Sequence, residues 1–365
     1  MRVAVLGWHG SVHTRRFARF FAEAGHEIHV ITCGGGDVTD TQRGDAPPYV
    51  VHELGLPAFG KAGYVAKIPA ARRLVRSLQP DVLHAHTATS YGLIAVATGI
   101  HPLAVTTHGS DVLLSTTNPA MRRVVRHVLL HADLITTPAE HMQQRIESLI
   151  GDRSRDVLVV QYGVETSRLV ALGAEVRADR NENDARRLVT ARPLTDLYRT
   201  DLAITALTEL GEEWRLDIAG DGPARGGLER HAAELGLSAR VSFHGYVPDE
   251  NTIHRLIAAA DIYVSMAESD GVSIALLEAL ALGTLPVLRD IPSNRAWIED
   301  GSTGALSEPT PAAIAASVRR TGALDADAAR RANQARVGQL ADRGVNLGRL
   351  LRRIEDLADG AAGPG

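Results

Sequence analysis

Cysteine, lysine and long apolar runs are scarce in this sequence, and each scarcity excludes a class of protein or site. Cys33 is the single cysteine among 365 residues, which excludes internal disulfides and sites built from several thiolates and favours a reducing, cytoplasmic location. Lys61 and Lys67 are the only lysines among 39 basic residues, so a phosphate-binding cation elsewhere must be an arginine. No apolar run approaches the roughly 20 residues that span a bilayer, and we expect at most peripheral membrane contact.

An excess of one charge sign is also lacking. The formal net charge is −4, divided into about +2 over residues 1–165 and about −6 over the remainder. A nucleic-acid-binding protein concentrates positive charge on one face. The sequence therefore predicts no nucleic-acid partner, and it leaves the oligomeric state open.

The pattern of apolar segments indicates two α/β domains. Domains average roughly 150 residues, so this chain is too long for one typical core. Short β-branched runs alternate with longer helical patterns, which predicts parallel strands joined by crossover helices. A helix is expected over 12–24, and strands over 3–6, 28–32, 81–85, 103–107, 132–137, 157–160, 188–191, 214–219, 241–244, 261–265 and 285–288.

The domain boundary is expected at a polar segment. Residues 166–186 contain Arg-Ala-Asp-Arg-Asn-Glu-Asn-Asp and no evident periodic apolar face, which predicts a linker. We therefore expect domains over 1–165 and 187–345, followed by a C-terminal helix and tail over 346–365. Two domains also make a cleft between them available for a ligand.

The most informative segment runs from Ser265 to Gly283, with the sequence Ser-Met-Ala-Glu-Ser-Asp-Gly-Val-Ser-Ile-Ala-Leu-Leu-Glu-Ala-Leu-Ala-Leu-Gly. It predicts a strand end, a loop of small residues and a helix with Ser273 as N-cap and Gly283 as the stop. The start of such a helix directs free amides and a positive dipole end at a phosphate. Glu278 lies among apolar residues within this helix, and a ribose would supply the hydroxyls that its carboxylate needs. A local cap or salt bridge is the alternative.

Asp270 and Glu278 resemble the Glu-x7-Glu signature of the family 4 retaining glycosyltransferases, with Asp in place of the first Glu. Leu216-Asp-Ile-Ala-Gly-Asp-Gly-Pro223 is similar to the family's strand and Gly-Asp-Gly-Pro turn, where the glycines serve the turn. Val241-Ser-Phe-His-Gly-Tyr-Val247 is similar to its Phe-x-Gly strand, so Gly245 and Tyr246 are candidates for the base pocket.

The segment 190–201 occupies the place of the family's Gly-Arg-Leu…Lys-Gly motif, whose Arg and Lys hold the donor diphosphate. Arg192 matches the Arg, Ala191 replaces the Gly, and the Lys is absent. Arg199 could substitute for it after a one-residue shift, because a guanidinium grips phosphate oxygens bidentately. Two solvated loop arginines are the alternative.

The first half carries two further loops that follow expected strands. Gly7-Trp-His-Gly-Ser-Val-His-Thr-Arg-Arg16 lacks the Gly-x-Gly-x-x-Gly fingerprint and the acidic residue of a dinucleotide site, so NAD is disfavoured. In the family this loop contacts the diphosphate or the acceptor, which makes Gly10 and Ser11 candidates. Arg15 and Arg16 either add positive potential or are ordinary surface residues.

The second loop, Thr106-Thr-His-Gly-Ser-Asp-Val112, matches the family's His-Gly-x-Asp loop. By this resemblance His108 approaches the donor sugar, and Asp111 is either catalytic or an N-cap for the next helix. His84 and His86 end another strand, and we interpret them as acceptor lining or packing, because no thiol or carboxylate stands at ligand spacing.

The resemblance implies a GT-B fold, in which two Rossmann-like domains with parallel sheets face each other across a cleft and C-terminal helices pack back on the first domain. It also implies metal-independent transfer from a nucleoside-diphosphate sugar to an acceptor, with retention of configuration. The diphosphate is assigned to Arg192, Arg199, Gly10 and the amides of Val272, Ser273 and Ile274, the ribose to Glu278, and the sugar to Asp270 and His108. The acceptor is expected to be a small metabolite or a glycan intermediate. A sugar-nucleotide epimerase and a non-catalytic nucleotide- or carbohydrate-binding protein are the alternatives.

Overall fold

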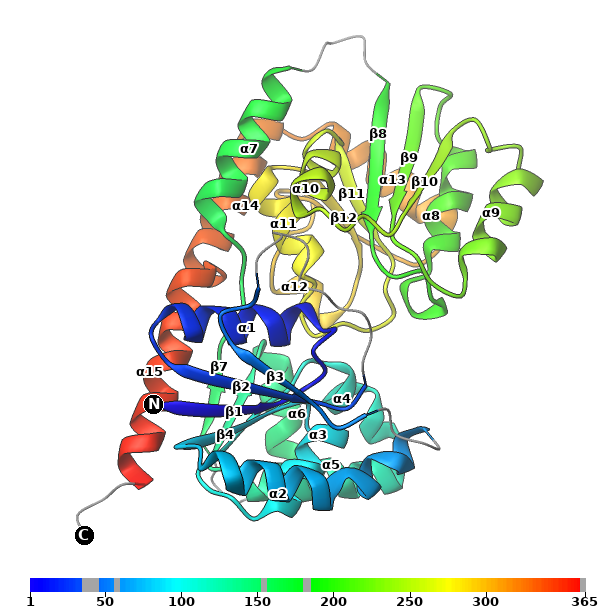
Figure 1. Ribbon diagram of the computed structural model, residues 1–365. Coiled ribbons are helices and arrows are strands. Elements are labelled where there is room, and N and C mark those ends of the chain that lie inside the picture. The colour runs from blue at the N-terminus through cyan, green and yellow to red at the C-terminus, as the bar shows by residue number, and fades with distance from the viewer. Residues whose placement is uncertain (35–45, 56–59, 152–155, 180–184, 362–365) are drawn as a thin grey trace. The chain divides into compact units, whose positions relative to one another are not determined.

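The computed structural model describes residues 1–34, 46–55, 60–151, 156–179 and 185–361. The chain divides into two compact units (Figure 1). Unit 1 contains Met1–Tyr162 and Gly344–Gly365, and unit 2 contains Gly163–Arg343. The polypeptide thus returns to unit 1 for its last helix.

Unit 1 is built on a seven-stranded parallel sheet in the order β3-β2-β1-β4-β5-β6-β7. Its strands are β1 (Arg2–Leu6), β2 (Glu27–Thr32), β3 (Val50–Glu53), β4 (Val82–His86), β5 (Leu103–Thr106), β6 (Leu134–Thr137) and β7 (Val157–Val159). Parallel strands that are covered on both faces read as continuous apolar runs, as Val3–Leu6 of β1 does. The carboxyl ends of β1, β4 and β5 lie side by side at one edge of the sheet.

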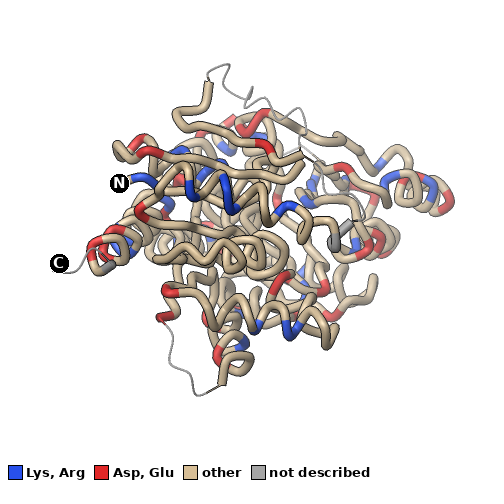
Figure 2. Tube along the Cα trace, turned by 60° about the horizontal axis from the view of Figure 1, so that its bottom comes forward, with Lys and Arg blue, Asp and Glu red and all other residues tan. Residues whose placement is uncertain are grey.

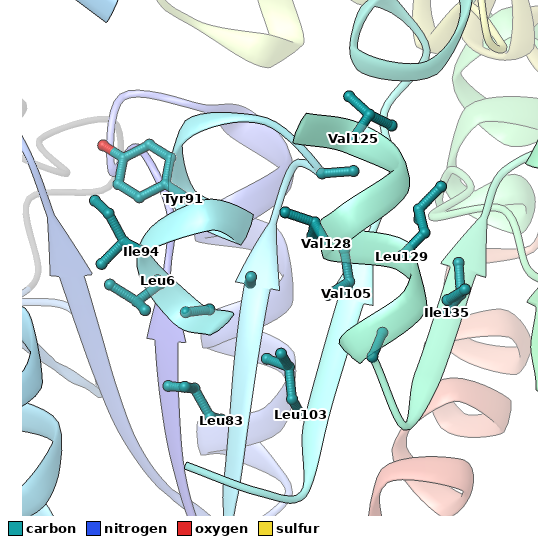
Figure 3. Close-up of a cluster of buried hydrophobic side chains, with 14 of the residues drawn as sticks. Leu6, Leu83, Tyr91, Ile94, Leu103, Val105, Val125, Val128, Leu129 and Ile135 are labelled. Atoms are coloured by element: carbon teal, nitrogen blue, oxygen red, sulfur yellow. The ribbon is translucent and has the colours of Figure 1, made fainter. Parts of the chain in front are cut away.

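Helices cover both faces of this sheet. They are α1 (Val12–Glu23), α2 (Ile68–Leu78), α3 (Ser90–Thr98), α4 (Ser110–Leu113), α5 (Pro119–His131), α6 (Glu140–Ile150) and α15 (Arg343–Ala361), with 3-10 turns over Gly60–Lys67 and Ser115–Thr117. Phe17 and Phe21 of α1 pack on one face together with Ile354 of α15. Ile94 of α3 and Val128 of α5 belong to the core on the other face (Figure 3).

Unit 2 is built on a six-stranded parallel sheet in the order β10-β9-β8-β11-β12-β13. Its strands are β8 (Arg186–Ala191), β9 (Trp214–Ala219), β10 (Val241–Gly245), β11 (Ile262–Ser265), β12 (Leu285–Arg289) and β13 (Ala305–Ser307). Its helices are α7 (Thr166–Ala178), α8 (Thr200–Ala206), α9 (Arg225–Glu234), α10 (Glu250–Ala258), α11 (Ile274–Leu282), α12 (Pro292–Arg295), α13 (Pro311–Gly322) and α14 (Ala326–Leu340), with 3-10 turns over Asp196–Tyr198 and Leu207–Glu209. This alternation of strands and helices gives a second Rossmann-like unit.

The prediction of a linker over 166–186 is wrong for most of that segment. Thr166–Ala178 form helix α7, which packs against α10, α11 and α14 within unit 2 (Figure 1). Leu169, Leu172, Gly173 and Val176 follow helical spacing, with Leu169 and Leu172 buried and Val176 packed on the same core. A Cβ at Gly173 would lie 2.0 Å from the Leu282 carbonyl oxygen, so glycine permits the close approach of α7 and α11.

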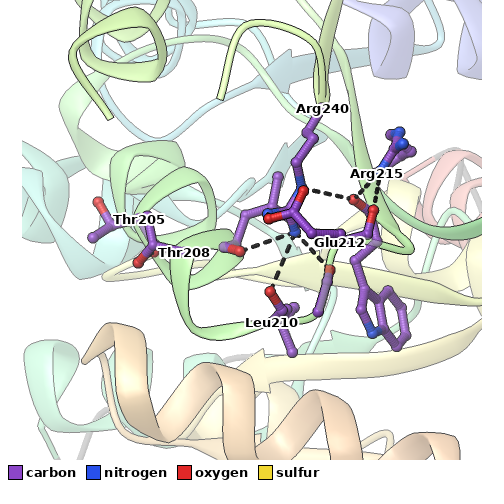
Figure 4. Close-up of polar contacts among 9 residues, drawn as sticks. Thr205, Thr208, Leu210, Glu212, Arg215 and Arg240 are labelled. Atoms are coloured by element: carbon purple, nitrogen blue, oxygen red, sulfur yellow. Dashed lines mark hydrogen bonds and ion pairs between the residues drawn. The ribbon is translucent and has the colours of Figure 1, made fainter. Parts of the chain in front are cut away.

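Arg240 lies at the amino-terminal side of the unit 2 sheet and donates several hydrogen bonds to the backbone there (Figure 4). Its guanidinium is buried and donates to the backbone oxygens of Leu207, Gly211 and Trp214 at 3.1, 2.8 and 3.2 Å. A fourth contact reaches the Glu212 carboxylate at 3.3 Å. These oxygens satisfy the donors of one buried guanidinium, which accounts for a charge inside the fold.

Charges on the helix surfaces are interleaved (Figure 2). Arg225 on α9, for example, contacts Asp221 and Glu229 at 3.3 and 2.8 Å.

Within the described part of the chain, no helix is both long and apolar enough to cross a membrane.

Candidate active site

The carboxyl ends of β8, β11 and β12 are neighbours in unit 2, and the loops that follow them carry most of the predicted donor-site residues. In open α/β sheets, ligands bind at this edge. Arg192 directly follows β8, and Asp270 and Ser273 lie between β11 and α11. Glu278 lies in the second turn of α11.

Arg192 joins these loops. Its Nη2 donates to Asp270 Oδ2 at 2.5 Å, and its Nη1 donates to Ser273 Oγ. The guanidinium also lies over the Tyr198 ring, with 4.2 Å from Cζ to the ring centroid. Burial lowers the pKa of Arg192, but attraction to Asp270 and nearby tyrosines outweighs this effect and raises it overall. The structure therefore brings a permanent, buried cation to the start of α11, and the roles of Arg192 and Ser273 in diphosphate binding stay predictions.

Gly220 and Gly222 have a second role beside the turn. Their φ angles are +148° and +157°, values that favour glycine. A Cβ at Gly220 would lie 2.0 Å from the Arg192 carbonyl oxygen, and one at Gly222 would lie 2.4 Å from that of Leu194. The Gly-Asp-Gly-Pro segment therefore packs directly against the backbone that presents Arg192.

Helix α11 begins and ends as predicted. The Ser273 hydroxyl accepts from the Leu276 amide at 3.2 Å, and Gly283 closes the helix in the left-handed region at φ +82°. Ser273 thus caps the helix and receives Arg192 with the same oxygen. The amides of the first turn and the arginine converge on one place, which suits a diphosphate.

Glu278 is buried and has a protein partner that the sequence did not reveal. His254 Nε2 lies 3.4 Å from Glu278 Oε1, while Arg168 Nη2 lies 3.1 Å from His254 Nδ1. Arg168 in turn contacts Glu165 at 2.6 Å. Because an arginine can only donate, His254 Nδ1 accepts and its Nε2 carries the proton that faces Glu278. The local salt-bridge alternative therefore describes part of the surroundings of Glu278.

Arg199 lies at this edge of unit 2 but is engaged with carboxylates. It contacts Asp201 at 2.9 Å and Glu268 at 3.5 Å, and its backbone is in the left-handed region at φ +46°. Glu268 also lies 3.7 Å from Arg289 at the end of β12. Arg289 is a third arginine at this edge, and it stands in no motif that would identify it from the sequence.

Gly245 ends β10, two strands away from β8 in the sheet, and Tyr246 follows it. Gly245 has φ +69°, and a Cβ there would lie 2.9 Å from Arg225 Nη1. The Tyr246 side chain is 67% exposed. An exposed aromatic ring at this edge is available for stacking on a base, so both residues stay predictions for the base pocket.

In unit 1, His108 follows β5 and Asp111 fixes the loop that carries it. Asp111 Oδ1 accepts from the amides of His108, Gly109 and Val112 at 3.1, 3.0 and 3.1 Å, and Oδ2 accepts from Ala88 N at 2.9 Å. The carboxylate is buried. These contacts favour a positioning role for Asp111, and they place His108 beside the end of β4.

His108 belongs to a cluster of aromatic rings, which we call the histidine cluster: His13, His84, His86, His108 and Tyr162. Ring centroids are 5.1 Å apart for His13 and His108, 4.7 Å for His84 and His86, and 5.4 Å for His86 and His108. Tyr162 stacks on His108 at 5.9 Å. Burial lowers the pKa of all four histidines, to about 3 for His84. At neutral pH the cluster is therefore uncharged.

Gly10 lies in the loop between β1 and α1 of unit 1. The predicted residues thus form two sets, one at the sheet edge of unit 2 with Arg192, Asp270, Ser273 and Glu278, and one at the sheet edge of unit 1 with Gly10 and His108. Among the residues that the structure describes, no group of three or more His, Cys, Asp or Glu side chains could hold a metal ion.

Comparison with known proteins assigns the chain to a family. Residues 2–138 match the family described as "Glycosyl transferase 4-like", and residues 175–337 match "Glycosyl transferases group 1". These two matches cover most of the chain. The chain therefore belongs to the family 4 type of GT-B glycosyltransferases, enzymes that transfer sugars.

Curated relatives are glycosyltransferases as well. A GDP-mannose-dependent alpha-(1-6)-phosphatidylinositol dimannoside mannosyltransferase of Mycobacterium tuberculosis is 36% identical over 117 residues, which is 32% of this chain and 29% of that protein. N-acetyl-alpha-D-glucosaminyl L-malate synthase of Bacillus anthracis is 22% identical, over 83% of this chain and 81% of that protein.

Solved structures share the fold. The Anabaena protein HepE, in complex with UDP and glucose, has a TM-score of 0.79 at 17% identity and covers 98% of this chain and all of that one. Sucrose-phosphate synthase of Thermosynechococcus elongatus has a TM-score of 0.82 at 15% identity, over 98% of this chain and 99% of that one. The predicted GT-B fold with two Rossmann-like units is thereby confirmed.

Proposed function

We propose that the protein transfers a sugar from a nucleoside-diphosphate donor to a hydroxyl of a small metabolite or glycan intermediate, with retention of anomeric configuration and without a metal. The observation that carries this proposal is the contact of Arg192 with Asp270 and Ser273 at the start of α11. It supplies a buried cation and helix amides at one place, which is what the leaving group requires.

Departure of a nucleoside diphosphate develops negative charge while the anomeric carbon becomes cationic. Preorganised donors stabilise such charge with little reorganisation of their surroundings. In this proposal Arg192 and the amides of Val272, Ser273 and Ile274 bind the diphosphate. Arg199 assists once the anion competes with Asp201 and Glu268 for its guanidinium.

Unit 2 accordingly binds the nucleotide sugar, and unit 1 binds the acceptor. HepE was solved with UDP and with UDP-glucose, and the mycobacterial relative is named for GDP-mannose. These names support a nucleotide-sugar donor and leave the base undecided between UDP, GDP and another. Gly10 and His108 stay assigned to the diphosphate and the donor sugar. The single cysteine, which is buried, supports a cytoplasmic location.

Asp270 has two roles in this proposal. Its Oδ2 holds the Arg192 guanidinium at 2.5 Å, and its remaining oxygen is directed to hydroxyls of the donor sugar. Aspartate is one methylene shorter than the glutamate of the family signature. We therefore expect a donor sugar that lies closer to β11, or a different donor preference, and we assign Asp270 no role as a displacing nucleophile.

The Glu278→Gln variant tests the ribose assignment. A hydrogen bond to a charged group contributes about 1.5–3 kcal/mol, so we expect nucleoside-diphosphate affinity to fall about 10- to 100-fold. The wild type should discriminate against the 2′,3′-dideoxy form of the nucleotide, and the variant should lose that discrimination. Calorimetric titration of both nucleotides into wild type and variant measures how much of the discrimination between ribose and dideoxyribose depends on Glu278.

Glu229→Gln is the matched control, because Glu229 lies on α9 and forms an ion pair with Arg225 at 2.8 Å. Its nucleotide affinity should equal that of the wild type. Unchanged discrimination between ribose and dideoxyribose in Glu278→Gln would show that Glu278 contacts something other than the ribose.

A further inference from the structure

His254 is a buried imidazole on the core face of helix α10. Its side chain is 2% exposed, and Ile257 and Ala258 on the same face are buried as well. An apolar side chain would fill this place at a lower cost, because a buried polar group destabilises the fold unless it is hydrogen-bonded. His254 Nε2 has no hydrogen-bond partner among the described residues, yet it lies 3.4 Å from Glu278 Oε1. Packing alone therefore does not explain a histidine at this position.

Arg168 determines which nitrogen of His254 carries the proton. Arg168 Nη2 lies 3.1 Å from His254 Nδ1, and an arginine has donors only, so Nδ1 must accept. The proton of the neutral imidazole then lies on Nε2, the atom beside Glu278. In the opposite tautomer a lone pair would face the carboxylate and repel it. Arg168 thus makes His254 a donor directed at Glu278.

Arg168 is itself held in place by Glu165. Arg168 Nε donates to Glu165 Oε2 at 2.6 Å, and Arg343 Nη1 donates to Glu165 Oε1 at 3.1 Å. Burial raises the pKa of Glu165, but the hydrogen bond from Arg168 and the charges of Arg343 and Arg168 outweigh this effect and lower it overall. Glu165 is therefore ionised at neutral pH. The guanidinium of Arg168 is fixed between this carboxylate and the imidazole of His254.

We propose that His254 is a positioning residue for the donor ribose, which donates from Nε2 to Glu278 while Arg168 holds it in the required tautomer. A neutral donor orients the carboxylate without cancelling the charge that binds a ribose hydroxyl. A side chain that is oriented before binding loses less conformational freedom when the ligand arrives. His254 and Arg168 thereby set how strongly ribose is preferred over deoxyribose. The inference rests on the proposed function, since it adds residues to the ribose site.

The His254→Leu variant tests this role, because it removes the donor and keeps much of the side-chain volume. The probes are the member of UDP, GDP, ADP and CDP that binds the wild type most tightly and its 2′,3′-dideoxy form. We expect affinity for the ribonucleotide to fall about 10-fold and affinity for the dideoxy form to change less than about 2-fold. His254→Gln keeps an N–H near the position of Nε2 and should retain most of the discrimination. Calorimetric titration measures all four affinities for each comparison with the wild type.

Variants of Arg168 separate positioning from folding, because this side chain is exposed. Arg168→Met removes the contact with His254 Nδ1 and should weaken the preference for ribose, whereas Arg168→Lys keeps a donor and should preserve it. In transfer assays the loss in Arg168→Met and His254→Leu should appear in the donor KM and not in kcat. His231→Leu is the matched control. It removes an imidazole of α9 that lies 2.8 Å from the Thr205 hydroxyl, and both nucleotide affinities should equal those of the wild type.

A double-variant cycle with Glu278→Gln gives the decisive comparison. In that background His254→Leu should have little further effect on the ribonucleotide, because both changes act on one contact. Equal losses for the ribonucleotide and its dideoxy form in His254→Leu and Arg168→Met would indicate a structural role and overturn the inference. If Glu278→Gln lost the preference for ribose while these two variants kept it, the inference alone would fail. If Glu278→Gln kept the preference, the ribose assignment of the proposed function would fail, and the inference with it.

Discussion

The Arg192→Met variant is expected to lose about 1000-fold in kcat. Removal of one preorganised donor to a developing anion costs about 10²–10³-fold, and Arg192 presents two donors from a buried position. Methionine keeps much of the side-chain volume and removes the charge. Single-turnover rates with a saturating donor, measured for the variant and the wild type, give the fold loss in the rate of transfer.

Two companion variants separate catalysis from stability. Arg186→Met removes an arginine from the same strand, β8, at its amino end, where the guanidinium lies over Trp214, and should turn over normally. Arg192→Met leaves the Asp270 carboxylate, of which 19% is exposed, without its cation, so adding Asp270→Asn should recover thermal stability but no activity. Recovery of activity in the double variant would mean that Arg192 serves only to hold Asp270.

The stability of unit 1 is expected to fall steeply as the pH falls below about 6.5. Burial lowers the folded-state pKa of His13, His84 and His86 far below that of an unfolded histidine. The unfolded chain therefore binds more protons in this range, and acid favours it. Each buried histidine contributes a slope of about 1.4 kcal/mol per pH unit, so three give about 4 kcal/mol per unit. Above about pH 7 the stability should be constant.

Hydrogen exchange localises this effect. Amides of β1 and β4 should lose protection between pH 7 and pH 5, after correction for the intrinsic rate, while amides of β8 and β9 should lose less. His84→Gln should reduce the slope by about 1.4 kcal/mol per pH unit. His131→Gln, at an exposed position on α5, should leave it unchanged. A flat pH profile for β1 and β4 would show that the histidine cluster accepts protons without unfolding.

The sequence predicted most of the fold because apolar runs and helix caps are local signals. The strands over Val3–Leu6 and Trp214–Ala219 and the helix from Ser273 to Gly283 were recognisable from composition and spacing alone. Helix α7 was missed because the charged residues that follow it obscured the spacing of Leu169, Leu172 and Val176. The strands β3 and β13 were also missed. Val-Val-His-Glu of β3 ends in two polar residues, and Ala-Leu-Ser of β13 contains no β-branched residue.

Only those residues of the candidate site that stand in a recognisable sequence motif were predictable. Arg192, Asp270 and Glu278 stand in recognisable segments, and the structure brings Arg192 and Asp270 into contact. His254 on α10 lies beside Glu278, and Arg168 on α7 contacts His254, but no spacing in the sequence connects these residues. The histidine cluster likewise gathers residues from α1, β4 and two loops. Such contacts follow from the packing of distant segments, which a single sequence does not reveal.

Thermal shift with nucleoside diphosphates tests the central claim most directly, because a ligand stabilises the folded state in proportion to its binding free energy. At 100 times Kd, the gain is about 2.7 kcal/mol. One member of a panel of UDP, GDP, ADP and CDP should stabilise the wild type more than its own monophosphate does, and Arg192→Met should abolish the difference between diphosphate and monophosphate. Equal stabilisation of Arg192→Met and wild type by the preferred diphosphate would contradict the claim that the start of α11 and Arg192 hold the donor.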